Sequence, residues 1–107
     1  MADTGFPKSD WKLYKEKLPV WQEDYMERLC QEYLDLLNSD QAASKKFWDL
    51  KERIYDDKSK VGVRAVMTPS MMHPNIVELI RENVITTEDL DGFSDELKEA
   101  VQGSLQW

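Results

Sequence analysis

Apolar side chains recur every three or four positions along most of this chain, which is the spacing of one face of an α-helix. The first run begins near Ser9 or Asp10, either of which can cap a helix, and it ends at Pro19. The second run begins at Pro19, a residue suited to the first turn of a helix, and continues to Leu37. The apolar positions of the two runs are Trp11, Tyr14 and Leu18, then Trp21, Tyr25, Leu29, Tyr33 and Leu36 or Leu37. We therefore expect two helices separated at Pro19, after a flexible N-terminus of residues 1–8.

A third helix is expected over about residues 41–55, after the stop and cap signals of residues 38–40. Its apolar stripe consists of Ala43, Phe47, Leu50 and Ile54. We expect the second and third helices to pack antiparallel. The core predicted between them consists of Trp21, Tyr25, Leu29, Phe47, Leu50 and Ile54.

Residues 60–67 follow a different pattern, because apolar and other residues alternate there with a period of two. The segment is either one short strand or an extended connector. A lone strand would leave backbone groups unpaired unless the same segment of another chain covered them. The connector is favoured, since Gly62 weakens a strand.

A fourth helix is expected after Thr68 and Pro69, with an apolar stripe over residues 76–80 and a left-handed C-terminal residue at Asn83. Thr86 and Asp89 then form a weak capping box. Gly92 and the cap candidate Ser94 divide the last segment into two short helices. The pattern as a whole predicts an all-α fold, a small orthogonal bundle of four to six helices, with residues 9–107 as one domain.

Length and composition agree with a single helical domain. The chain has 107 residues, of which 41% are hydrophobic, and this is enough material for one buried core. Cys30 is the only cysteine, so an internal disulfide is impossible and a reducing compartment is favoured. The longest uninterrupted apolar run is residues 65–67, and the N-terminus lacks the features of a signal peptide. We expect a cytoplasmic protein that does not enter the membrane.

Few residues are suited to catalysis or to binding a metal or cofactor. His73 is the only histidine, and with Cys30 it is too little for a zinc site. The four glycines are scattered and cannot form a phosphate-binding loop. An EF-hand-like spacing at residues 87–98 fails, because Thr87 and Lys98 stand where acidic ligands belong. We therefore expect no enzyme activity, no cofactor and no metal. The expectation of no enzyme activity would be overturned if two carboxylates were paired in a cleft.

The aromatic supply is large for a small domain, with four tryptophans, four tyrosines and three phenylalanines. Aromatic side chains exposed on a small domain often mark an interface. We expect a protein-binding or regulatory module, with a protein partner or self-association to a homodimer. The candidate interaction residues are Trp48, Tyr55, Arg64 and Trp107.

Charge leaves two alternatives open. Residues 45–64 carry seven basic and four acidic groups among aromatic residues, a mixture that also binds nucleic acid. The net charge of −7 disfavours binding to phosphate backbones. Conversely, the acidic residues 18–44 and 65–107 could mimic DNA and block a DNA-binding protein.

Two segments carry a family resemblance, WKLYKEKLPVWQEDYMERLCQEYLDLL and NIVELIRENVITTEDLDGFSDELKEAV. Their recognisable elements are Leu18, Pro19, Trp21, Gln22, Tyr25 and Met26, and later Ile85, Thr86, Asp89, Leu90, Phe93, Ser94 and Leu97. Residues 11–101 thereby resemble a family of small uncharacterised bacterial proteins of about this length. Relatives of this kind are sometimes labelled multidrug transporters, but this chain lacks the run of about 20 apolar residues that a membrane helix needs. The resemblance implies a helical fold and supplies no catalytic residues.

Overall fold

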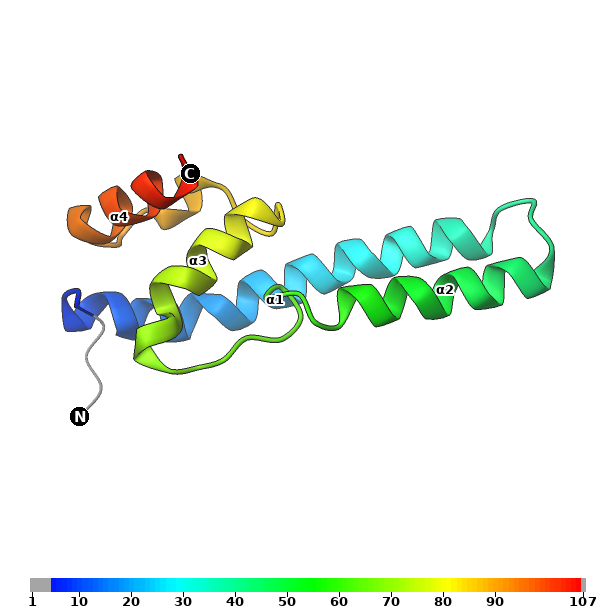
Figure 1. The fold of residues 1–107 in the computed structure, drawn as a ribbon, viewed down its shortest axis with the longest axis horizontal. Helices are drawn as coiled ribbons and strands as arrows, with labels where there is room; N and C mark the ends of the chain where they lie inside the picture. The colour runs from blue at the N-terminus through cyan, green and yellow to red at the C-terminus, as the bar shows by residue number, and fades with distance from the viewer. Residues whose placement is uncertain (1–4, 107) are drawn as a thin grey trace.

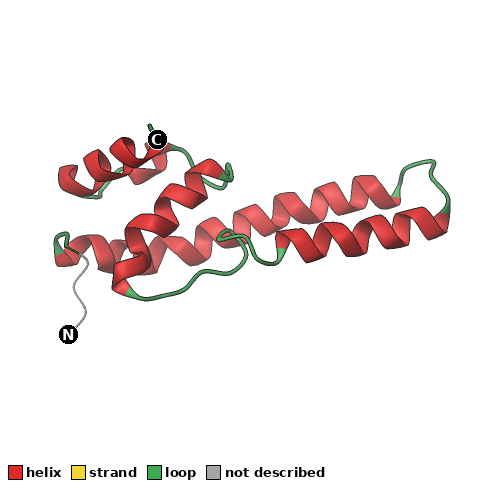
Figure 2. Cartoon of the chain, in the orientation of Figure 1, coloured by secondary structure: helices red, strands yellow, loops and turns green. Residues whose placement is uncertain are grey.

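The computed structural model describes residues 5–106, and its secondary-structure elements are all helices, joined by loops (Figures 1 and 2). Its α-helices are α1 (Lys8–Leu37), α2 (Ala43–Asp57), α3 (Met72–Arg81) and α4 (Asp95–Leu105). Two short 3-10 helices, η1 (Pro69–Met71) and η2 (Thr87–Leu90), precede α3 and α4. The described residues contain no strand, which confirms the all-α prediction and makes residues 60–67 a connector. Two backbone amides, those of Val63 and Arg64, donate to the carbonyl of Lys60, so this connector starts as a turn.

The first two predicted helices are one helix of 30 residues, and the prediction of a break at Pro19 is wrong. The apolar positions Tyr14, Leu18, Trp21 and Tyr25 keep a spacing of three or four across the proline and are all buried. Pro19 itself lies on the exposed side of α1, where water can satisfy the carbonyl that loses its backbone partner. Burial of the continuous stripe outweighs the roughly 3 kcal/mol that a proline costs inside a helix.

The N-terminal half of α1 packs with α3, η2 and α4 to form what we call the head (Figure 1). Its apolar core consists of Tyr14, Leu18, Trp21, Met72, Ile76, Val77, Leu79, Ile85, Leu90, Phe93, Leu97 and Val101. Phe6, in the segment expected to be flexible, packs against the edge of this core. The head therefore contains most of the buried apolar side chains of the described residues.

Polar contacts and helix caps fix the head elements to one another. The buried carboxylate of Asp10 accepts hydrogen bonds from the backbone amide and the hydroxyl of Ser94, at 2.8 and 2.5 Å. Ser94 in turn caps α4 by accepting from the amide of Leu97, as its sequence position predicts. The capping box of Thr86 and Asp89 also forms. Asp10 is thus a tertiary contact, whereas the sequence suggested that it caps α1, which begins at Lys8.

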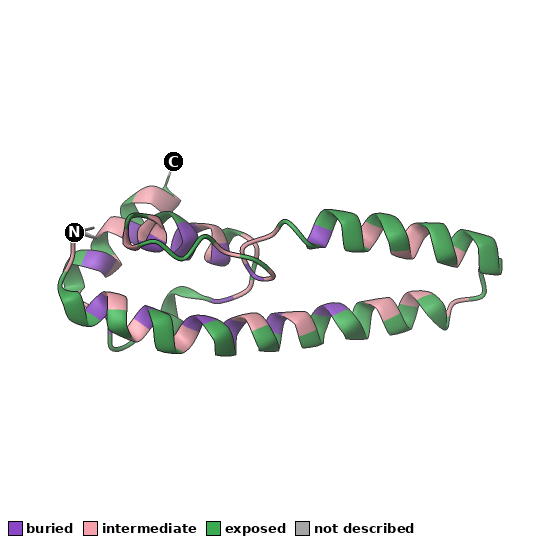
Figure 3. Cartoon of the chain, turned by 90° about the horizontal axis from the view of Figure 1, so that it is seen from below, coloured by how far each residue is buried: buried purple, intermediate pink, exposed green. Residues whose placement is uncertain are grey.

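The C-terminal half of α1 turns back into α2, and this helical hairpin extends beyond the head (Figure 1). We call residues 26–58 the arm; the molecule measures 52 × 26 × 24 Å along its principal axes. Its two helices run antiparallel, as predicted. Of the core predicted between them, Trp21, Tyr25 and Leu29 on α1 are buried, but the part predicted on α2 is wrong. Phe47 and Ile54 are 63% and 45% exposed, and Leu50 is half-buried. Figure 3 shows how few buried positions α2 has; the one in its described span is Asp57.

Candidate interaction surface

Several polar contacts join the two helices of the arm along a seam. The hydroxyl of Tyr33 on α1 donates to Asp57 on α2 at 2.6 Å, and Arg53 pairs with Glu32 at 2.9 Å. Lys60 adds an ion pair to Asp57 at 3.1 Å. Directed contacts of this kind fix which residues of α1 lie level with which residues of α2.

The seam shifts the acid–base equilibria of its members. Burial of Tyr33 and its hydrogen bond to Asp57 raise the pKa of the phenol above its ordinary value. Burial alone would raise the pKa of Asp57, but hydrogen bonds from Tyr33 and Lys60 favour the carboxylate, and the net pKa is lowered. The carboxylate is therefore the stabilised form at neutral pH, and it holds the base of the arm together.

Because α2 turns a polar face to α1, its apolar stripe points to one side of the hairpin. Ile54 lines a hollow of about 220 Å³ between the helices, opposite Met26 and Cys30 of α1. Phe47 lies seven residues before Ile54, two helical turns away on the same side. On α1, Leu34 and Leu37 follow Cys30 at spacings of four and three, and both are exposed. We call Cys30, Leu34, Leu37, Phe47 and Ile54 the apolar side of the arm.

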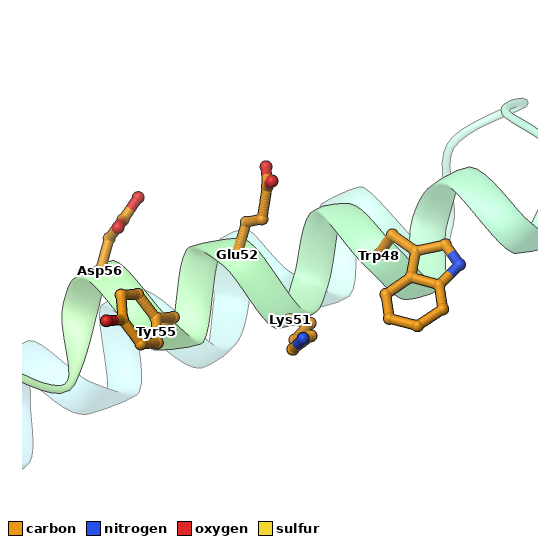
Figure 4. A pocket seen from close by; sticks show the side chains of 5 residues that line it. All are labelled: Trp48, Lys51, Glu52, Tyr55 and Asp56. Carbon is orange, nitrogen blue, oxygen red and sulfur yellow. The ribbon is translucent and has the colours of Figure 1, made fainter.

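A second exposed group, Trp48 and Tyr55, continues around α2 from the apolar side. Figure 4 shows both rings along one side of the helix, with the carboxylates of Glu52 and Asp56 pointing away from them. Lysine ammonium groups lie over the rings: that of Lys51 is 5.4 Å from the Trp48 ring centre, and that of Lys58 is 4.6 Å from the Tyr55 ring centre. All the side chains that line this hollow of about 450 Å³ come from one helix, so it is an open surface without a closed binding cavity.

The predicted interaction residues are brought together only in part. Trp48 and Tyr55 are exposed on α2 at 57% and 66%, two helical turns apart on the same side of the helix. Arg64 is exposed in the connector, outside α2. Trp107 lies outside the described residues.

Sequence reasoning placed Phe47 and Ile54 in the core, and so missed the apolar side of the arm as an interaction surface. One signal could have found it. The apolar positions of α2 include Phe47, Leu50 and Ile54 together with Trp48 and Tyr55, and they span too wide an arc for contact with one neighbouring helix. Part of such a helix must face either a further element or solvent.

Groups suited to metal binding or catalysis are scattered. Within residues 5–106, no three His, Cys, Asp or Glu side chains are placed to hold a metal ion. His73 lies at the edge of the head, where its Nε2 is 3.2 Å from the hydroxyl of Ser104 and its ring contacts Phe6. Cys30 is exposed on α1. Its position beside Ile54 makes it part of the apolar side.

Most of the basic side chains of residues 45–64 are engaged within the chain. Lys45 pairs with Asp49 at 2.8 Å, Arg53 with Glu32 and Lys60 with Asp57. With Lys51 and Lys58 lying over aromatic rings, five of the seven basic groups of residues 45–64 have intramolecular partners. Carboxylates in their midst repel phosphate, which weakens the case for nucleic acid.

Comparison with protein-family models, curated proteins and solved structures finds no match to this chain. None of the helices in residues 5–106 combines the length and the apolar character needed to cross a membrane.

Proposed function

We propose that this protein is a non-enzymatic protein-binding module and that the arm is the part that binds. One observation carries the proposal. Along α2, the large apolar side chains Phe47, Trp48, Ile54 and Tyr55 are 45% to 66% exposed, while the buried position is the acidic Asp57. In a monomeric domain the apolar side chains of a surface helix usually face the core and its charged side chains face solvent, so the arrangement on α2 is reversed.

Single exposed hydrophobic residues are common and need no explanation, but a contiguous group along one element marks an interface. Burial of the exposed halves of these side chains would contribute about 1 kcal/mol for each one. Four or more such contributions can offset much of the free-energy cost of association. Trp and Tyr are also the residues most often found to dominate binding energies.

The arm is also built to hold this surface in place. Arg28 of α1 donates to the backbone carbonyls of Asn83 and Val84, at 2.9 and 3.1 Å, and this ties the base of the arm to the head. The Tyr33–Asp57 and Arg53–Glu32 contacts hold α2 against α1. A pre-ordered surface loses little conformational entropy on binding.

Photo-crosslinking tests the proposal. A benzoylphenylalanine replaces Phe47 on the arm in one variant and Val20 in a control; Val20 is 59% exposed on α1 outside the arm. We expect protein adducts from position 47, in a native lysate or with the purified chain alone, that are absent from position 20. Excess unlabelled wild-type chain should compete for these adducts, and a Phe47→Ser chain should compete poorly. Equal labelling at the two positions would contradict the proposal.

A further inference from the structure

The charged residues that share a side with the apolar residues are acidic on α1 and basic on α2. On α1, Glu23 and Glu27 lie seven residues before Cys30 and Leu34, so they share the same side of that helix. On α2, Lys51 and Lys58 each lie four residues after an apolar member, Phe47 and Ile54. All four charged residues are exposed. The apolar residues therefore share their side with acidic residues on α1 and with basic residues on α2.

Contacts across the seam show which residues stand at the same height along the arm. The Glu32–Arg53 and Tyr33–Asp57 contacts give two slightly different registers for the antiparallel helices. Counting from the first contact, Glu27 is level with Lys58; counting from the second, it is level with a position five residues further along the chain. Glu27 and Lys58 therefore lie within roughly 8 Å of each other in height, a difference that two long side chains can span.

A surface with acid on one helix and base on the other is complementary to itself after a half-turn about the long axis of the arm. That rotation exchanges left and right but keeps heights, so α1 of one copy lies on α2 of the other. Glu27 then meets the other copy's Lys58, and the reverse contact forms at the same time, as in any two-fold interface. Turning one arm end for end would instead reverse the heights, so that Glu27 at the base would face the tip of the other copy's α1 and neither Glu27–Lys58 contact would form.

We infer that the partner of the apolar side is a second copy of this chain, packed so that two arms form a four-helix bundle with α1 of each on α2 of the other. The inference rests on the function proposed above and names its partner. The head contacts α1 through Tyr14, Leu18 and Trp21, positions on a different side of the helix from Cys30 and Leu34. A four-helix bundle gives the apolar stripe of α2 the second neighbour that it lacks in one chain.

The size of the surface sets the strength of the dimer. A helix of 15 residues is roughly 22 Å long, and two helices side by side are roughly 20 Å wide. Their outline of roughly 440 Å² is smaller than the about 800 Å² that each partner buries in a standard interface. The dimer should therefore dissociate in the micromolar range, in rapid exchange with monomer.

Charge reversal distinguishes this arrangement from others. Glu27→Lys places lysine opposite lysine in a dimer of its own kind, and Lys58→Glu places glutamate opposite glutamate. Each variant alone should dimerise about tenfold or more weakly than the wild type, since two attractive pairs become repulsive. An equimolar mixture should regain wild-type dimerisation, because both contacts of the mixed dimer join Glu to Lys. Sedimentation equilibrium over a range of concentrations measures these constants, and circular dichroism checks that each variant folds.

Lys12→Glu and Glu99→Lys form the matched control, since both positions are exposed and lie outside the arm. Neither change, alone or mixed, should alter dimerisation. Recovery on mixing at 27 and 58, with no effect of the control pair, supports the inference. A dimer that ignores the reversals at 27 and 58 overturns it, as does a chain that stays monomeric at every concentration. In the monomeric case, adducts to another protein at position 47 would leave the proposed function standing, and their absence would remove both.

Discussion

Gly62 is the point at which the connector crosses α1, and replacing it by alanine should destabilise the fold sharply. A Cβ added at Gly62 would lie 2.6 Å from the Cγ2 of Val84 and 2.8 Å from the Cε2 of Tyr25, with the Cδ2 of the same ring nearer still. Carbon atoms that are not bonded prefer separations of about 3.5 to 4.0 Å, so the ring or the connector must move by roughly 1 Å. The ring has little freedom, because Tyr25 is only 6% exposed and its face is covered by the guanidinium of Arg28 at 5.2 Å.

Overpacking of this kind costs about 1 to 3 kcal/mol, and we expect Gly62→Ala to fall in the upper half of that range. Gly103→Ala is the control, since a Cβ there meets nothing within 4 Å and the residue lies inside α4. Alanine in place of a helical glycine should raise stability by about 1 kcal/mol. Urea unfolding followed by circular dichroism gives both free energies. Gly62→Ala with stability equal to or above that of the wild type would refute the packing described for the connector.

Three further substitutions test the polar contacts. Asp10→Ala should lower the free energy of unfolding by about 3 kcal/mol, because it leaves the backbone amide of Ser94 without its partner. Ser94→Ala keeps the contact between that amide and Asp10 and should lower the free energy of unfolding by only about 1 kcal/mol. Equal losses for the two variants would contradict this. Asp57→Asn should destabilise the arm at neutral pH, because the folded state lowers the pKa of Asp57 and so favours its carboxylate. The difference in stability between variant and wild type should shrink as the pH falls below the ordinary aspartate pKa of about 3.9. Glu82→Gln should do the opposite: burial raises the pKa of Glu82, so the neutral variant should melt higher at pH 7 and lose that advantage below about pH 4. Thermal unfolding across pH checks both, and differences that do not depend on pH would contradict them.

The local signals that the sequence carries are mostly those of the head. Asn83 adopts a positive φ of 61°, Ser94 caps α4, and Thr86 with Asp89 forms the capping box. Each of these features depends on a few neighbouring residues, so its signal is complete within a short stretch of sequence. Pro19 is different, because a proline in a first turn and a proline inside a helix have the same local surroundings. Only the unbroken spacing of the apolar stripe across Pro19 indicates that the helix continues.

The way in which the two helices of the arm face each other cannot be predicted from apolar periodicity. Spacing identifies Phe47 and Ile54 as sharing one side of α2, and they do, but it does not say what that side faces. The face toward α1 is decided by Tyr33–Asp57 and Arg53–Glu32, pairs separated by 24 and 21 residues that no local pattern reveals. The candidate surface therefore emerged only when the two helices could be placed side by side.

Cys30 provides the most direct measurement of whether the apolar side of the arm is covered in solution. It is the only thiol in the chain, it is exposed in the single copy, and it lies on the apolar side next to Ile54. The rate at which iodoacetamide alkylates it should fall as the concentration of wild-type protein rises through the micromolar range, and the Phe47→Ser chain should react at the fast rate throughout. A wild-type rate that stays fast and independent of protein concentration would contradict the docking of a second copy on the arm.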